Sequence, residues 1–293
     1  KEFKICTSLL VILLYLDKSS SFHLLNIAQF MIPMRTILYN KYNFSYNKTK
    51  NTYIAKYIRN LHFTNDSDIN QIVTYNNLCH IEINHMTKLF TKQLPESLQS
   101  LTIRDNNFNL PLDKLPKSLK ILEMHCMNFD HPLHKLPNSV QSLHIDCKHI
   151  DIMCYPQSLQ SLTLRYSEFS GNINNLPPSL KSFAISNNKK QSLNDLSFDK
   201  LPQSLETLEI YGDLNKSLDN LPKNLKSLTL WCFKYNLALD KLPEFLNKLI
   251  LLNCYTFNKP LDKLPKNLQI LKLLSTPFDD LNQLPNGLRY LKI

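Results

Sequence analysis

Three histidines and two cysteines with the capacity to bind a metal fall close together in the chain: His125, Cys126, His144, Cys147 and His149. Zinc takes imidazole nitrogens and thiolates of this kind in tetrahedral sets. The spacing matches no zinc-finger pattern. Cys126 and Cys147 also occupy equivalent positions in two copies of a sequence repeat. A repeat places like residues next to each other whether or not they bind a metal. We therefore assign no metal site to this group.

Other patterns typical of enzymes are missing from the sequence. It has no glycine-rich phosphate loop, no GxSxG and no HExxH, and only 3 of its 293 residues are glycine. We therefore expect a protein that is not an enzyme, with no catalytic residues and no cofactor.

A unit of about 20 residues recurs along most of the chain and must position every side chain of interest. A Leu-Pro pair, degenerate at Pro156, is followed by two apolar residues at i and i+2. The units are 19 to 22 residues apart, with one interval of 25. A fixed period of this size indicates a solenoid. The apolar pairs are Leu61/Phe63, Ile81/Ile83, Leu101/Ile103, Leu122/Met124, Leu143/Ile145, Leu162/Leu164, Phe183/Ile185, Leu208/Ile210, Leu228/Leu230, Leu249/Leu251, Leu271/Leu273 and Leu291/Ile293.

Each apolar pair has the alternation of a short strand, with both members on one face. Because one such strand cannot bury its face alone, successive copies should stack about 4.8 Å apart as a parallel sheet. Proline cannot donate to the sheet and should lie outside it. The Ser or Asn two residues later should bond a nearby backbone group and fix the turn. Extended or 3₁₀ segments are expected on the back, with aromatics such as Phe108 and Phe129 returning to the core.

The unit from Phe257 to Leu273, FNKPLDKLPKNLQILKL, resembles the FNIP repeat, a variety of leucine-rich repeat, and the resemblance covers residues 54–293. It implies a leucine-rich-repeat-like parallel β-sheet horseshoe of about twelve short coils. Asn106 and Asn188 hold the place of the asparagine ladder of leucine-rich repeats. Other residues hold that place in further units, namely Met127, Lys148, Phe233 and Cys254.

Residues 1–50 differ in pattern and predict a small domain of three short helices before a solenoid over residues 51–293. This segment resembles a divergent F-box, the helical module that docks on the Skp adaptor of a cullin ubiquitin ligase. Thr7-Ser8 stands where that family has Leu-Pro, and the usual late Trp is absent. F-box and FNIP repeats occur together in giant viruses of amoebae and in social amoebae. The resemblance rests on Ala28, Arg35 and the residues that it implies bind the adaptor, Leu10, Leu13, Tyr15, Leu16, Leu24 and Leu25.

Two other interpretations of the N-terminal segment remain open. In the first, the helices only cap the apolar edge of the first coil, as every solenoid requires, and the protein is a plain leucine-rich-repeat binding scaffold. In the second, Leu9–Leu16 is the core of a signal peptide. The protein would then be a secreted receptor-like repeat protein, which would need disulfides and glycans.

The outward strand positions vary freely from unit to unit, whereas the buried positions scarcely change. We expect the outward columns to form the concave face, and we predict that this face binds a target protein. Tyr211, Trp231, Ile250, Leu252 and Leu274 should form an exposed apolar patch there. Aromatic and arginine side chains are frequent hot spots of binding. The predicted target-binding residues are Arg104, His125, Arg165, Tyr211, Trp231 and Leu252.

The composition of the chain limits the kinds of partner and the cellular compartment that we expect. The net charge is +10, and lysines before Leu-Pro should form a solvated ladder along one side. This ladder has no interleaved aromatics, so we expect no nucleic acid, and we expect no membrane partner. Seven cysteines without paired spacing suggest free thiols in the cytoplasm, or in the host cytoplasm if the protein is viral. The last strand should leave an open edge at which a dimer can form.

Overall fold

The computed structural model describes residues 60–63, 77–84, 94–150, 152, 154–165, 168–169, 173–187, 193–277 and 284–293. The predicted F-box-like domain of residues 1–50, with its six adaptor-binding residues, lies outside this part of the chain.

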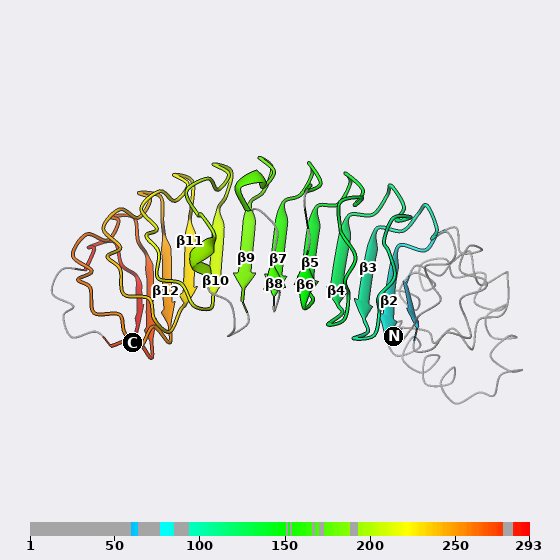
Figure 1. Ribbon diagram of the computed structural model, residues 1–293. Coiled ribbons are helices and arrows are strands. Elements are labelled where there is room, and N and C mark those ends of the chain that lie inside the picture. Colours follow the sequence, from blue (N-terminus) through cyan, green and yellow to red (C-terminus); the bar gives the residue numbers. More distant parts are fainter. Residues whose placement is uncertain are drawn as a thin grey trace, which may run out of the picture.

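The described residues form a parallel β-solenoid whose main sheet has twelve strands. Each of these strands pairs with the next one of the main sheet along the chain, so that they lie side by side in one curved row (Figure 1). The strands are β1 (Asn60–Phe63), β2 (His80–Asn84), β3 (Ser100–Arg104), β4 (Ile121–His125), β5 (Ser142–Asp146), β7 (Ser161–Arg165), β9 (Ser182–Ser186), β10 (Thr207–Tyr211), β11 (Ser227–Trp231), β12 (Lys248–Leu252), β13 (Ile270–Leu274) and β14 (Tyr290–Lys292). Each contains a predicted apolar pair, except that Ile293 lies just beyond the end of β14.

Where the structure describes it, the returning half of a coil has little regular structure, as the short repeat predicts. A second, two-stranded parallel sheet joins β6 (His149–Ile150) to β8 (Glu168–Phe169). Two 3₁₀ turns, η5 (Ile173–Asn175) and η6 (Leu193–Asp195), complete the described elements. Within the described ranges, no helical segment has the length and apolarity needed to cross a membrane.

The core lies behind the main sheet and is built by the second and fourth residues of the main-sheet strands from β2 to β13. Neighbouring strands pair in register, so that Leu122 faces Leu143 and Met124 faces Ile145. These side chains are essentially inaccessible to solvent. Aromatic side chains from the far side complete the core: Phe108 stacks on Phe129 with ring centroids 6.1 Å apart. The inner coils thus bury their apolar faces against their neighbours, as stacked repeats require.

From Pro95 to Pro285, the Leu-Pro pair (Tyr-Pro at Pro156) sets a tight turn just before each of ten strands. In the first such turn, the Leu98 N–H donates to the Pro95 carbonyl at 3.0 Å, and the same bond recurs in the nine other units up to Pro285. The serine between them acts differently from the prediction. Its hydroxyl donates to the carbonyl of the preceding coil, as in Ser97 Oγ to Leu78 O at 2.7 Å and Ser118 Oγ to Leu98 O at 2.6 Å. This serine clamp therefore joins two coils instead of closing its own turn.

Replacing one serine of this kind should weaken the stack measurably. Ser118→Ala leaves the Leu98 carbonyl without that donor, and we expect the free energy of unfolding to fall by about 1 kcal/mol in urea titrations. The control is Ser142→Ala at the outward-facing start of β5, which should stay within about 0.5 kcal/mol of the parent. Equal losses in the two variants would contradict the clamp.

A ladder of buried side chains follows the strand ends, as the asparagine ladder of leucine-rich repeats does. In most coils, the buried residue lies one position earlier than predicted. Asn106, Met127, Lys148 and Phe233 are exposed, whereas the residue before each of them is buried: Asp105, Cys126, Cys147 and Cys232. The alternation of faces explains the correction, because the residue directly after the outward strand end turns inward. Cys126 Sγ donates to Ile103 O at 3.6 Å, and Cys232 Sγ donates to Ile210 O at 3.7 Å. Thiols thus occupy the place of asparagine amides.

The predicted position of Cys254 in the ladder is correct, because one residue is inserted before it. Asn253 has a left-handed backbone with a φ of 51°. This extra residue restores the inward position of Cys254, whose Sγ donates to Leu230 O at 3.7 Å. All six cysteines of the described part are free thiols, as the sequence suggests.

The predicted lysine ladder is an ion-paired ladder rather than a bare row of charge. Lys135 Nζ lies 3.1 Å from Asp113 Oδ2, and Lys263 Nζ lies 2.8 Å from Asp240 Oδ2, each in the preceding coil. Lys241 pairs with Asp219 in the same way at 3.2 Å. Exposed pairs of this kind contribute little to stability, about 0 to 1 kcal/mol each. Their effect is to neutralise much of the positive charge along that side.

The strand β14 is exposed along its length, in contrast to the inner strands. Leu291 and Ile293 hold the places of the buried apolar pair but are 40% and 61% exposed. No described residue packs beyond them. A dimer contact at this edge stays a prediction.

Candidate interaction surface

The first, third and fifth residues of each strand point away from the core and form what we call the outer face of the sheet. All six predicted target-binding residues lie at the fifth position, so parallel pairing brings them into one line across the sheet. Arg104 is in register with His125, and Tyr211 is in register with Trp231. They are spread from β3 to β12, and therefore form a column rather than one compact cluster.

The part of the column nearer the N-terminus is charged, and its charges are paired between coils. Arg104 Nε lies 3.2 Å from Glu82 Oε1, and its Nη2 lies 3.9 Å from Glu123 Oε2. His125 Nδ1 lies 3.5 Å from Asp146 Oδ2. Arg165 is exposed at the end of β7. These pairs leave a polar surface with both signs of charge.

The part nearer the C-terminus is aromatic and apolar. Trp231 is 40% exposed, and the Tyr211 ring meets it edge-on with centroids 5.9 Å apart. The Tyr211 hydroxyl donates to Glu209 Oε2 at 2.7 Å. Burial and this Glu209 contact raise the pKa of Tyr211 to about 12, so the phenol stays protonated and can donate to Glu209. That hydrogen bond orients the Tyr211 ring beside the indole.

The apolar patch is smaller than the sequence predicts. Leu252 and Leu274 are half-buried, and Ile250 is only 9% exposed. Ile250 occupies the third strand position, between Thr229 on β11 and Lys272 on β13. Thr229 is buried as well. The accessible part of the patch is therefore Trp231 with its half-buried neighbours.

Exposed aromatics also lie just beyond the strand ends, and sequence reasoning did not identify them as part of the surface. Phe233 and Tyr255 stack with centroids 5.7 Å apart and planes 5° apart, although they are 41% and 55% exposed. The two aromatics lie one repeat apart, at equivalent places after two successive strands. That spacing in the sequence predicts that such a pair will stack.

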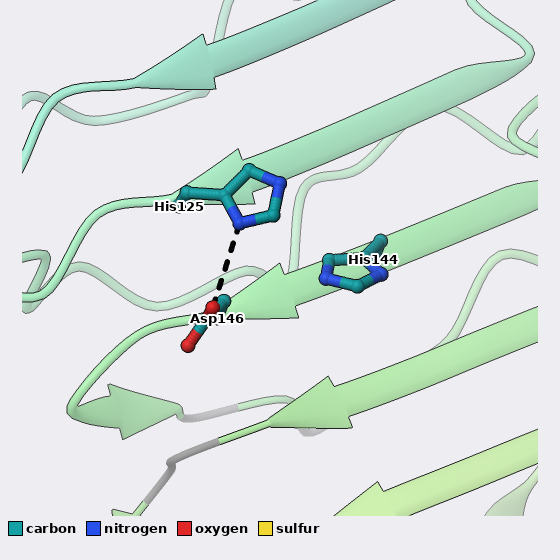
Figure 2. Close-up of side chains that lie close together, drawn as sticks. All are labelled: His125, His144 and Asp146. Carbon is teal, nitrogen blue, oxygen red and sulfur yellow. Dashed lines mark hydrogen bonds and ion pairs between the residues drawn. The ribbon is translucent and has the colours of Figure 1, made fainter.

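The group of histidines and cysteines is divided between the two faces of the sheet. Cys126 and Cys147 are buried in the core, while His149 lies in the separate strand β6. The thiols and the imidazoles therefore do not form one cluster, because adjacent strand residues point to opposite faces of the sheet. On the outer face, His125 and His144 meet with ring centroids 5.0 Å apart, beside Asp146 (Figure 2). Asp146 was missed as a member of this cluster, although it follows His125 by one repeat.

The twelve parallel strands, the short coils and the buried leucine columns define a parallel β-solenoid of the leucine-rich-repeat type. A family model described as the FNIP repeat matches residues 88–127, and it supports an FNIP variety of leucine-rich-repeat protein. Repeat families of this kind are typically non-catalytic interaction scaffolds. The comparison with curated proteins found no match.

Three solved structures resemble this chain to different extents. An internalin from Listeria monocytogenes has a TM-score of 0.57 and 20% identity, over 84% of this chain and 77% of that one. YopM from Yersinia enterocolitica has a TM-score of 0.49 and 23% identity, over 74% and 46%. CroV588, described as a circular leucine-rich-repeat protein, has a TM-score of 0.29 and 21% identity, over 80% and 53%. The chain thus spans about half the length of the last two. The internalin likeness supports the fold alone.

Proposed function

We propose that this protein is a non-catalytic interaction module that serves as the substrate-recognition subunit of a Skp–cullin–F-box type ubiquitin ligase. In this proposal, residues 1–50 recruit the Skp adaptor, and through it the cullin. The outer face of the sheet holds the target protein. The adaptor half rests on the F-box resemblance of Leu10, Leu13, Tyr15, Leu16, Leu24 and Leu25.

The observation that supports the target half is the exposed Trp231 at the end of β11, with the Tyr211 ring packed against it. Tryptophan at 40% exposure leaves apolar surface in water that has no packing role within the chain. Aromatic side chains held in one conformation contribute most to binding, because little further side-chain entropy is lost when a partner covers them. Trp231 and Tyr211 are therefore the proposed anchor of the interface.

The charged part of the outer face adds selectivity to this proposal. Arg104, Arg165 and the acidic side chains around them present alternating charges on neighbouring strands. A partner must match that order, since like charges brought together at an interface cost several kcal/mol. The proposed target is thus a protein with an apolar anchor site and a mixed-charge flank.

The adaptor half is tested with the full chain and purified Skp adaptor. The parent protein should retain the adaptor, whereas a Leu13→Asp/Leu24→Asp double variant should lose it, because both leucines belong to the proposed docking helices. Trp231→Ala serves as the matched control and should retain the adaptor fully. If the parent does not bind the adaptor while its repeats remain folded, the protein is a plain repeat scaffold.

The target half is tested in amoebal lysate with the parent and Trp231→Ala side by side. Proteins that the parent captures and the variant loses are candidate targets. Recovery should fall by more than about tenfold, since a hot-spot tryptophan contributes at least about 2 kcal/mol. Equal capture by both proteins would place the interface elsewhere.

A further inference from the structure

Three potential metal ligands converge on the outer face between β4 and β5. His125 ends β4, and His144 and Asp146 lie at the third and fifth positions of β5. One ligand atom from each lies within 4.8 Å of the other two, and the side chains face one another in Figure 2. The cluster forms because His125 is in register with Asp146, and His144 is two residues before Asp146 on the same face.

Two polar atoms of this cluster are buried without a hydrogen-bond partner among the described residues, namely His144 Nε2 and Asp146 Oδ1. Buried polar atoms are nearly always satisfied, and an unsatisfied one calls for a specific explanation such as a bound ion. The contact of His125 Nδ1 with Asp146 Oδ2 at 3.5 Å is also long for a hydrogen bond. The three groups are thus close together without satisfying each other.

The separation of these atoms suits a small divalent ion. A zinc–ligand distance near 2.0 Å in tetrahedral geometry places ligand atoms roughly 3.3 Å apart. The His125–Asp146 contact of 3.5 Å is already close to that value. The remaining pairs need to close by at most about 1.5 Å from the 4.8 Å limit, which rotation of partly exposed side chains can supply.

Carboxylates supply the negative charge near the cluster. Asp146 contributes one within the cluster itself. Glu123 lies beside the cluster in register with His144, but it also pairs with Arg104 at 3.9 Å. The Asp146 carboxylate is therefore the charge that would attract a cation.

We propose that His125, His144 and Asp146 form a binding site for a divalent transition-metal ion, with zinc as the best fit. Two imidazoles and one carboxylate are a ligand set that zinc and iron use when a coordination position stays open. Here the three ligands lie on the outer face of the sheet, and their side chains are partly exposed. A carboxylate or imidazole of a partner protein is the group that would complete the coordination. The site requires neither the adaptor nor the target in order to bind the ion.

The test uses the full chain, reduced and stripped of metals with a chelator. Calorimetric titration with Zn²⁺ should show one saturable site that is weakened at least about tenfold in Asp146→Asn and in His144→Ala, since each removes a ligand. The control His131→Gln changes a histidine outside the cluster and should bind as the parent does. Zn²⁺ should also raise the melting temperature of the parent and the control, but not that of the two ligand variants.

Titration with Co²⁺ distinguishes this site from binding by thiols. The parent should give weak visible bands typical of nitrogen and oxygen ligands, without the intense near-ultraviolet absorption of a cobalt–thiolate bond. Three results would overturn the proposal: no saturable binding by the parent, equal binding by the parent and both ligand variants, or thiolate absorption at the first equivalent. Because Trp231→Ala leaves all three ligands in place, failure of target binding by that variant does not bear on the metal site.

Discussion

Phe183→Ala should lower the free energy of unfolding by about 3 to 5 kcal/mol, the largest loss expected from a single truncation in this chain. Phe183 is the one aromatic residue at the second strand position, and it lies between Leu162 on β7 and Leu208 on β10. Its side chain is completely buried. Removing the ring leaves a cavity in the middle of the solenoid, where coils on both sides are held in register and cannot close the gap.

The matched control for that variant is Phe245→Ala, which removes the same side chain from a position that is 60% exposed. It should change the free energy of unfolding by less than about 0.5 kcal/mol. Urea titrations followed by both circular dichroism and Trp231 fluorescence measure the two variants. A small loss for Phe183→Ala would show that the central coils can repack.

Alkaline pH should destabilise the protein through its buried thiols. Burial raises the pKa of Cys232 far above its usual range, and contact with Cys126, together with burial, does the same for Cys147. The native state therefore keeps protons that the unfolded chain releases above about pH 8.5. Stability from this source is complete below that pH and is lost as the pH rises. At pH 10 the loss from Cys232 alone is about 2 kcal/mol.

Cys232→Ala isolates this contribution. At pH 7 the variant should be less stable than the parent by about 1 kcal/mol, because it loses the sulfur and its contact with the Ile210 carbonyl. At pH 10 the order should reverse, since only the parent has a thiol there to ionise on unfolding. Urea titrations at both pH values, with a reductant present, measure the difference. Cys154→Ala changes an exposed thiol and should leave both values as in the parent. A constant difference between parent and Cys232→Ala would contradict this account.

The strands were predictable from the sequence because each is short and its buried residues recur at a nearly fixed interval. Leu122 and Met124 can only be buried together if the strand at 121–125 presents one face to the core, and β4 does so. The acceptor of the serine hydrogen bond was not predictable from the sequence. Ser118 is near its own turn in sequence, but stacking brings the Leu98 carbonyl closer to its hydroxyl. Local patterns do not report such contacts between coils.

The sequence predicted which residues line up on the outer face. It did not predict how exposed each of them is or which of them form a cluster. The fifth strand position correctly placed Arg104 and Trp231 in one line on the outer face. Exposure differed within the apolar patch, since Ile250 is only 9% exposed. The metal cluster joins residues from two columns on two strands, and only the register of β4 with β5 brings them together. A histidine and an aspartate one repeat apart in the sequence indicate that the two side chains lie side by side on the sheet.

The serine clamp has a consequence for how the protein is made. Ser118 and Ser139 each donate to a carbonyl 20 residues earlier in the chain, and strand pairing runs in the same order. Each coil therefore finds its docking site already complete when it leaves the ribosome, so the solenoid can grow in the direction of synthesis. Since the serine clamps of the described coils reach no further than the adjacent coil, gene duplication can insert or delete a whole unit without disturbing the others. The length of the outer face is thus open to evolutionary change in steps of one repeat.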